Sequence, residues 1–261
     1  MAFDIRQVDL GKLNSMTKYP SIPTYHTLGD KGMLQETVLV SFSGRVVGTE
    51  KVDGTNARLV FCPDGGAVVG SREDLLWDRR DLIGNPAMGI VEAVREVVQH
   101  LYEKLCRQDR VAVYYVEVFG RNIGGAARNY TRQGKVGFRL FDAVTIEDYD
   151  ELLGWPADRI ARWRDQGGQR YLDADRLVQV AADIGFQPVP ALLDLDASGL
   201  PTGLEEAYQF LLRCPSSGCK LDERAEGVPE GIVVRSPDRS RIAKLRREDY
   251  DRTLRRRQGK R

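Results

Sequence analysis

The segment EKVDGTNARLVF, residues 50–61, places a short polar run between two stretches of strand composition. The chain must therefore leave one strand near Lys51 and enter the next within a few residues, where a loop at a sheet edge can face a ligand. An Asp-Gly pair between apolar runs is also the strongest short-range signal of a β-hairpin turn. From this segment alone, a hairpin turn is the favoured interpretation, and a ligand-binding loop is the alternative.

Strand and helix patterns alternate along the chain in a way that predicts an α+β fold. Strand composition is found in residues 37–62, 67–76, 110–120 and 135–148, and residues 230–246 predict two strands joined by a Pro-Asp turn. Apolar residues at helical spacing occupy residues 87–106, and short amphipathic helices separated by Gly and Pro follow. Between these helices we expect an extended piece at 186–195.

The 261 residues contain no internal repeat and no long linker. We therefore expect one domain, 1–261, with a helical insertion at about 148–225 and a basic C-terminal tail at 247–261. From Arg239 onward the chain reads RSRIAKLRREDYDRTLRRRQGKR. This segment either contacts phosphates or forms a solvated helix.

Composition argues against several classes of protein. The 39 Lys and Arg balance 38 Asp and Glu, so the net charge of +1 indicates neither a nucleic-acid nor a membrane partner. No run approaches the roughly 20 apolar residues of a membrane span, and the N-terminus lacks the apolar core of a signal peptide, so we expect a cytoplasmic protein. The cysteines are too few for a disulfide framework, and CPSSGC is spaced too widely for a usual zinc pair.

Charged residues interrupt several of the predicted strands. Arg72 stands at a strand end, Glu117 lies inside an apolar strand, and Glu230 begins one. Lys244 and Arg246 are two residues apart and so project from the same face of their strand. Any single one is best explained by an internal ion pair, because an unpaired buried charge is costly. Together, around one lysine loop, they favour a shared anionic ligand and a metal.

The ordered blocks EKVDGTN, SR, VEVFG, FRLFD, EGIVV and AKLR resemble the covalent nucleotidyltransferases, which comprise ATP-dependent DNA and RNA ligases and mRNA-capping guanylyltransferases. The resemblance covers nearly the whole chain. It is closest to the RNA ligase 2 type, because Asn56 completes KVDGTN, KYPSI precedes the lysine strand, and the helical insertion precedes EGIVV. The implied fold is an antiparallel-sheet nucleotidyltransferase domain of the ATP-grasp-like ligase adenylation type, with the nucleotide held between sheets.

The resemblance implies a catalytic role for three residues: Lys51 as the nucleophile, with Lys244 and Arg246 as phosphate-binding cations. It implies Glu230 as the ligand of Mg²⁺ or Mn²⁺, in keeping with the preference of magnesium for carboxylates. Asn56 would act on the RNA end during the sealing step.

Nucleotide contacts are implied for six residues, Glu50, Lys51, Arg72, Glu117, Phe138 and Lys244. Glu50 would border the adenine through its backbone, Arg72 would hold the ribose or a phosphate, and Glu117 would accept from a ribose hydroxyl. Phe138 would stack on the purine, although a strand phenylalanine is as often a core residue.

The implied chemistry needs an uncharged lysine. Its amine attacks the α-phosphorus of ATP to give lysyl-AMP, and only the unprotonated amine has the lone pair to do so. Because the reference pKa of lysine is about 10.4, a divalent cation and the charges of Lys244 and Arg246 would help by disfavouring the ammonium.

Two features depart from the family pattern. The last block usually carries two lysines, whereas the second position here is Arg246, which keeps the charge but presents a planar fork. The 15 residues after Arg246 are too few for the C-terminal domain of many ligases or for the oligonucleotide-binding barrel of DNA ligases and capping enzymes. The tail would then grip phosphates in place of such a domain.

The sequence therefore predicts an ATP- and magnesium-dependent RNA ligase that joins a 5′-phosphate to a 3′-hydroxyl. The natural RNA, including whether it is a nicked duplex, and the oligomeric state stay open. One alternative is a DNA ligase-like enzyme or another nucleotidyltransferase. A second is a noncatalytic nucleotide- or RNA-binding module, although a pure binder needs no nucleophile.

Overall fold

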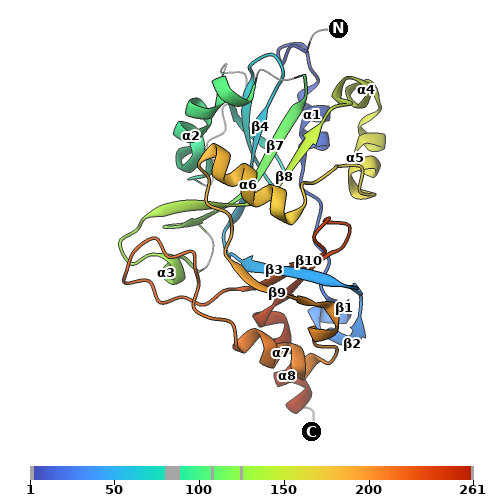
Figure 1. Cartoon of the computed structure of the whole chain (residues 1–261), viewed down its shortest axis with the longest axis vertical. Helices are drawn as coiled ribbons and strands as arrows, with labels where there is room; N and C mark the ends of the chain where they lie inside the picture. The colour runs from blue at the N-terminus through green and yellow to red at the C-terminus, as the bar shows by residue number, and fades with distance from the viewer. Residues whose placement is uncertain (1–2, 80–88, 107–108, 124–125, 260–261) are drawn as a thin grey trace.

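Two antiparallel sheets follow one another along the long axis of the molecule (Figure 1). The computed structural model describes residues 3–79, 89–106, 109–123 and 126–259. The five-stranded sheet has the order β6-β5-β4-β7-β8, and the four-stranded sheet has the order β11-β10-β3-β9. A two-stranded sheet of β1 (His26–Leu28) and β2 (Leu34–Val38) lies beside the second of these.

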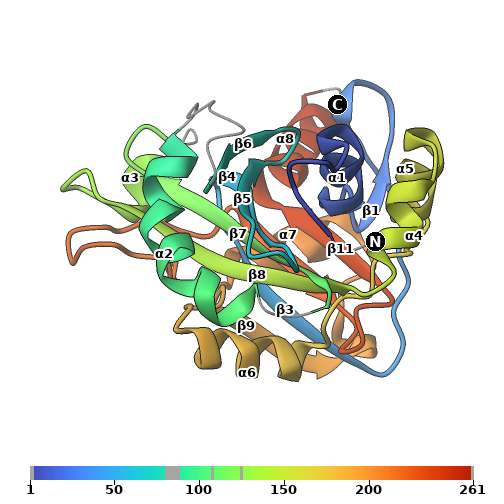
Figure 2. The same ribbon diagram turned by 90° about the horizontal axis from the view of Figure 1, so that it is seen from above.

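The five-stranded sheet is buried on both faces. Its strands are β4 (Thr55–Phe61), β5 (Ala67–Ser71), β6 (Leu75–Asp78), β7 (Val111–Gly120) and β8 (Val136–Ile146). Helices α2 (Ile90–Leu105) and α6 (Ala174–Ile184) cover one face. Helices α1 (Leu10–Thr17), α4 (Tyr149–Gly154) and α5 (Ala157–Asp165) cover the other (Figure 2). Apolar burial on both sides explains why these strands are nearly continuous hydrophobic runs.

The four-stranded sheet is packed with helices on one face only. Its strands are β3 (Arg45–Lys51), β9 (Ala191–Asp196), β10 (Gly231–Arg235) and β11 (Ile242–Arg246). Helices α7 (Leu204–Leu212) and α8 (Arg247–Gln258) pack below it. The burial of β11 alternates along the strand, as expected for a sheet with one apolar face. Short elements complete the fold: η1 (Asp30–Gly32), α3 (Ala127–Tyr130) and η3 (Ala197–Gly199).

The hairpin interpretation of the lysine loop is wrong. Strands β3 and β4 belong to different sheets, so the Asp53-Gly54 segment carries the chain from one sheet to the other. Gly54 is required there by close packing, because a Cβ atom at this position would lie 2.3 Å from the carbonyl oxygen of Val118. A glycine is therefore required at position 54, but the reason is the close approach of the backbone to β7 and not the geometry of a turn.

Several other predictions are confirmed. The Pro-Asp turn joins β10 to β11, and the tail forms α8. The helix expected at 87–106 is α2, and residues 87 and 88 lie outside the described residues. Region 148–225 contains helices α4, α5, α6 and α7, but its extended piece is β9, an edge strand of the four-stranded sheet. In the part of the chain that the structure describes, no helix has the length and apolar character to cross a lipid bilayer.

Candidate active site

Lys51 ends β3 on the face of the four-stranded sheet that is turned toward the five-stranded sheet. The strand register aligns Lys51, Gly231 and Arg246 in one row across β3, β10 and β11. A Cβ atom at Gly231 would lie 1.8 Å from the carbonyl oxygen of Leu245, so no other residue fits. Because Gly231 has no side chain, none stands between Lys51 and Arg246 in this row.

Glu230 fills the space between these two cations. Its Oε2 lies 2.5 Å from Lys51 Nζ, and its Oε1 accepts from Arg246 Nε at 2.6 Å. The side chains of Lys51 and Glu230 are 24% and 14% exposed, so this charge-assisted pair is shielded but still reachable. The geometry puts a proton acceptor within hydrogen-bond reach of the lysine amine, which a lysine nucleophile requires.

Lys244 projects from the same face as Arg246, as the sequence predicts. Among the residues that the structure describes, no carboxylate lies within ion-pair distance of it, whereas Arg246 pairs with Glu230. Burial lowers the pKa of Lys244, and the charges of Lys51, Arg246 and Arg72 lower it further. A half-buried cation without a protein counter-ion is suited to binding an anionic ligand.

A second row of polar residues faces this group from the five-stranded sheet. The strand register aligns Asn56 on β4 with Glu117 on β7, and Glu117 with Arg139 on β8. On the other side of β4, Ser71 is paired with Ala57, and Arg72 is the next residue along the chain. The Oδ1 atom of Asn56 is buried and has no hydrogen-bond partner in the structure. Because buried polar atoms are nearly always paired, this atom marks a position where a ligand is expected.

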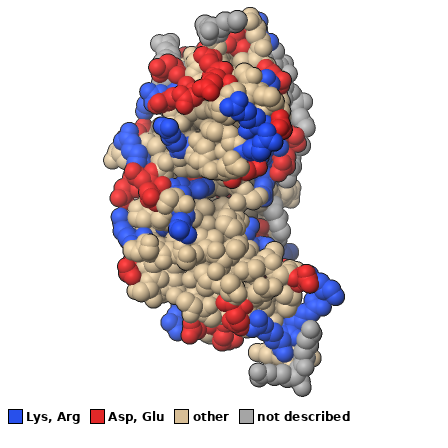
Figure 3. All heavy atoms as spheres, turned by 90° about the vertical axis from the view of Figure 1, so that its right-hand side faces the viewer, with Lys and Arg blue, Asp and Glu red and all other residues tan. Residues whose placement is uncertain are grey.

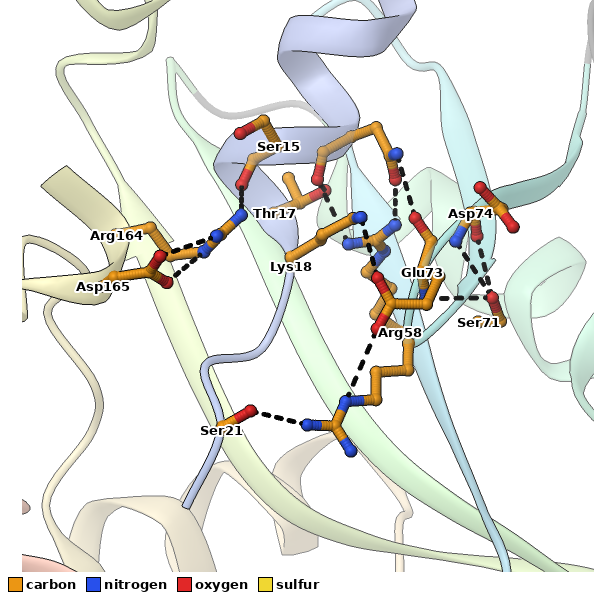
Figure 4. A network of polar contacts seen from close by, with 12 residues as sticks. Ser15, Thr17, Lys18, Ser21, Arg58, Ser71, Glu73, Asp74, Arg164 and Asp165 are labelled. Carbon is orange, nitrogen blue, oxygen red and sulfur yellow. Dashed lines mark hydrogen bonds and ion pairs between the residues drawn. The ribbon is translucent and has the colours of Figure 1, made fainter. Parts of the chain in front are cut away.

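Arg72 lies at the rim of the site. Its guanidinium donates to Ser21 Oγ at 2.7 Å, and its Nε lies 3.7 Å from Glu73, which also pairs with Lys18 (Figure 4). These contacts attach the β5–β6 turn to the segment after α1. The charge of Arg72 also helps to lower the pKa of Lys244, after burial and the charges of Lys51 and Arg246.

Glu117 is the acid of the site whose ionisation is most strongly altered. Burial raises its pKa to about 8, and the negative charges of Glu230 and Asp53 add to this rise against the opposing charge of Lys51. Asp53, which the sequence analysis did not single out, has a pKa that burial and Glu230 also raise. The charge of Lys51 opposes the rise in the pKa of both acids, so Glu117 and Asp53 belong to the same electrostatic environment as the lysine.

The raised pKa of Glu117 predicts a pH dependence of stability. Between its ordinary pKa of 4.5 and about 8, the folded state binds a proton that the unfolded state does not, so stability falls as pH rises through this window. We expect Glu117→Gln to lose this component, at most about 1.4 kcal/mol per pH unit. Thermal unfolding at pH 5 and pH 8 measures this component. The stability of the variant relative to the wild type should be higher at pH 8 than at pH 5. An equal difference at both pH values, or the same gain in the exposed control Glu96→Gln, would contradict the prediction.

Glu50 turns away from the site. Its side chain lies on the opposite face of β3 from Lys51, where its carboxylate accepts from the Ser217 hydroxyl and from Gly218 N at 2.9 Å. Its own N–H donates to the carbonyl of Pro190 at 2.9 Å. The side chain of Glu50 therefore anchors the loop before β10, and a nucleotide contact through its N–H would compete with Pro190.

Phe138 does not lie with these residues, which corrects its assignment as the stacking ring. It is paired with Val118, so it shares the face opposite Glu117 and packs edge-on against Phe186, with ring centroids 5.2 Å apart. Phe141 is half-buried and contacts the cluster that contains Val52, next to Lys51, and its ring centroid lies 5.0 Å from that of Tyr19. Both rings belong to the block FRLFD, but only the strand register decides which one faces the site.

The acidic side chains of the site are suited to a divalent cation whose other ligands are the phosphates of the substrate. Among the described residues, no cluster of three or more His, Cys, Asp or Glu side chains has the arrangement of a protein-held metal site. Glu230 and Asp53 offer carboxylate oxygens beside Lys51. Magnesium is commonly bound by one or two carboxylates together with substrate phosphates. These residues suit that mode, and Glu230 would then exchange its ion pair with Lys51 for the cation.

Comparisons with known proteins agree with this geometry. Residues 44–247 match the family model described as RNA ligase. An apo mutant of the Naegleria gruberi RNA ligase aligns with a TM-score of 0.55 and 17% identity, covering 91% of this chain and 62% of that one. An archaeal ATP-dependent RNA ligase aligns with a TM-score of 0.54 and 18% identity, covering 89% and 49%.

A Naegleria gruberi RNA ligase mutant with ATP and Mn aligns with a TM-score of 0.51 and 19% identity, covering 90% of this chain and 62% of that one. These alignments show a shared fold. The chain spans less than two thirds of the length of these ligases. A comparison with curated proteins gives no significant match.

Proposed function

The chain belongs to the RNA ligase family, and on that premise we propose that it is an ATP-dependent RNA ligase. It would join a 5′-phosphate to a 3′-hydroxyl, a reaction that repairs a broken strand. The observation that carries the proposal is the contact of 2.5 Å between Lys51 Nζ and Glu230, on the sheet face from which Lys244 also projects without a carboxylate partner among the described residues. A binding module would need the cations but not a lysine paired with a proton acceptor.

In the first step, the nitrogen of Lys51 forms a bond to the α-phosphorus of ATP while the bond to pyrophosphate breaks. Before the attack, the ammonium would lose a proton to water as Glu230 turns from it to the divalent cation, because only the free amine has the lone pair to attack. Lys244 stabilises the charge on the phosphate oxygens, and Arg246 keeps Glu230 in position through its contact of 2.6 Å. Lys51 then carries AMP, which the 5′-phosphate of the RNA takes over; the 3′-hydroxyl finally displaces AMP.

Glu230 and Asp53 would hold the divalent cation, Mg²⁺ or Mn²⁺. When bound, such a cation neutralises phosphate charge as pyrophosphate leaves. Asn56 supports the assignment of a ligand to the same cleft, because its buried Oδ1 has no partner. Burial raises the pKa of Glu117 to about 8, so its carboxyl group would be neutral at pH 7. It could then donate a hydrogen bond to a ribose hydroxyl or accept one from it.

Phe141 should carry the stacking contact with the adenine. Stacking of a base on an aromatic ring contributes about 1–3 kcal/mol, so we expect Phe141→Ala to raise the Kd for ATP by about tenfold or more. Phe138→Ala is the matched control, because it removes the same ring from the core face and should lower thermal stability instead. Fluorescence or calorimetric titration with ATP measures both. A larger loss of ATP affinity in Phe138→Ala would reverse the assignment.

The proposed function is tested with ATP labelled at the α-phosphate. Purified protein with magnesium should acquire label that survives denaturing electrophoresis and transfers to 5′-phosphorylated RNA, which is then sealed. Single-stranded RNA, nicked RNA duplex and nicked DNA tested in parallel separate an RNA ligase from a DNA ligase-like enzyme. Labelled protein without sealing of any of these would indicate transfer to another acceptor, and no label at all would indicate a binding module.

A further inference from the structure

Two loops that project from one side of the molecule carry a cluster of exposed cations (Figure 1). One loop connects β7 to β8 and includes α3, and the other lies between α7 and β10. We call the cluster the basic arm; its residues are Arg121, Arg128, Arg132, Lys135, Lys220 and Arg224. The proposed chemistry at Lys51 uses none of them.

The two loops are hydrogen-bonded to each other, and Figure 2 shows them side by side. Leu221 N donates to the carbonyl of Tyr130 at 2.8 Å, and Gly227 N donates to that of Asn129 at 3.1 Å. The carboxylate of Asp222 accepts from the Thr131 hydroxyl at 2.7 Å. Backbone N–H groups of the first loop donate to the same carboxylate: Arg132 N at 2.8 Å and Gln133 N at 3.1 Å. The cations of both loops are therefore held in fixed relation to each other.

The positive charges of the arm are not neutralised by the protein. None of the six cations forms an ion pair with a residue that the structure describes. Asp222 accepts hydrogen bonds from hydroxyl and N–H donors. These bonds, of which that from Thr131 has the largest effect, lower the pKa of Asp222 to about 2. Only Glu223 and Glu226 remain as exposed acids in the second loop. A surplus of positive charge thus accumulates on a chain whose net charge is +1.

The C-terminal helix α8 differs from the arm, although its sequence is more basic. Arg252 pairs with Asp249 at 2.7 Å, Arg255 pairs with Asp251 at 2.9 Å, and Arg257 pairs with Glu36. On the side of the molecule away from the arm, positive and negative side chains are interspersed (Figure 3). Cations that already have partners gain less from a phosphate than cations that have none.

The arm is anchored on both sides of the nucleophile. Tyr130, which is fully buried in the first loop, accepts from the N–H of Asp53 at 2.7 Å. Ser217 and Gly218, in the second loop, hold the carboxylate of Glu50. Glu50, directly before Lys51, and Asp53, two residues after it, are therefore both hydrogen-bonded to the base of the arm, which lies beside the lysine loop.

From this charge and geometry we propose that the basic arm binds the phosphate backbone of the RNA and leads its end to Lys51. The proposal rests on the ligase function proposed above and adds the surface that engages the RNA. It places the main phosphate contacts on the arm and not on α8, in contrast to the role that the sequence suggested for the tail.

The test compares two triple variants that remove equal charge. In Arg128→Gln, Arg132→Gln, Lys135→Gln, the arm loses three unpaired cations. In Arg162→Gln, Arg255→Gln, Arg257→Gln, the protein loses three exposed arginines that are paired with acids. The Kd for a 5′-phosphorylated single-stranded RNA is measured by fluorescence anisotropy from 50 to 300 mM salt, and thermal unfolding shows that each variant is folded.

We expect the arm variant to bind RNA about 10- to 100-fold more weakly at low salt. Its slope of log Kd against log salt should fall by about 2, since each lost contact to a single strand removes about 0.7. The control triple should keep the wild-type slope. The charge-preserving variant Arg128→Lys, Arg132→Lys, Lys135→Arg should also keep it, which would show that charge and not packing is responsible.

Different results separate this inference from the proposed function. If the wild type acquires labelled AMP and the folded arm variant still binds RNA with the wild-type affinity and slope, the arm proposal is overturned and the ligase function stands. An equal loss in both triple variants would also overturn it, because the effect would then follow total charge. Wild-type protein that acquires no AMP would refute the ligase function itself, whatever the RNA affinity of the variants.

Discussion

Lys51→Ala is expected to abolish covalent attachment of AMP. The proposed reaction forms a bond to this nitrogen, so removing it eliminates the product itself, and the labelled band should fall by roughly 10³-fold or more, to the detection limit of the gel. Sealing of ordinary 5′-phosphorylated RNA should disappear with it. RNA supplied with a 5′-adenylyl group should still be sealed, because that substrate bypasses the first step. The measurement is denaturing electrophoresis with ATP labelled at the α-phosphate.

Two controls separate the nucleophile from its charge. Lys51→Arg keeps a cation beside Glu230 but has no amine that can be deprotonated in a protein, so it should be as inactive as the alanine variant. Lys104→Ala removes a surface lysine whose Nζ donates to the carbonyl of Asp183, and it should label normally. Label retained in Lys51→Ala would place the reactive residue elsewhere and remove the basis of the proposed mechanism.

The ion pair between Lys51 and Glu230 gives the site a resting state. While Glu230 holds the amine at 2.5 Å, the nitrogen is engaged with the carboxylate and is not free to attack phosphorus. Arrival of ATP with its divalent cation would give Glu230 a stronger partner than the ammonium. The same contact that positions Lys51 therefore also keeps it unreactive until its substrate is present.

The arrangement of the cations follows from local patterns and could be predicted. Lys244 and Arg246 alternate with buried residues along one strand, and a period of two is enough to place them on one face. The sequence also showed Glu117 and Glu230 to be out of place in apolar strands. The structure brings all four near Lys51.

Other features depend on long-range pairing, which local patterns do not contain. Asp53-Gly54 has the composition of a hairpin turn, but whether β3 pairs with β4 depends on β10 and β7, which lie much later in the chain. The choice between Phe138 and Phe141 required the register of β8 on β7 and the irregularity near Tyr115. A one-residue change in register exchanges the two faces of a strand, so no count along one strand could decide it.

The density of charge along the sequence does not show which cations lack partners, for a related reason. The tail has the highest density of arginine, yet acids four residues earlier on the same helix, and Glu36 from β2, neutralise several of them. The cations of the arm are scattered in the sequence and become a cluster only when the two loops pack together. Net charge along the chain is therefore a poorer guide to a phosphate surface than the list of cations without partners.

A buried polar network joins the two sheets at the other end of the cleft. Asp142 on β8 is fully buried and accepts from Tyr19 Oη at 2.8 Å and from Arg239 Nε at 2.9 Å. Arg235 on β10 lies 3.4 Å from the same carboxylate. One acid thus balances two buried arginines, and it is the link by which β8 holds the β10–β11 turn.

We expect Asp142→Ala to destabilise the protein by about 3 to 5 kcal/mol, because it leaves Arg235 and Arg239 buried without a counter-charge. Urea unfolding gives the change in the free energy of unfolding. Asp142→Asn keeps the shape but not the charge and should be similarly damaging. Asp194→Ala is the matched control: it breaks an ion pair of similar geometry between Asp194 and Arg45, 2.8 Å apart on the surface, where solvent replaces the lost partner. Equal destabilisation by Asp142→Ala and Asp194→Ala would show that the network adds no more to the free energy of unfolding than a surface pair.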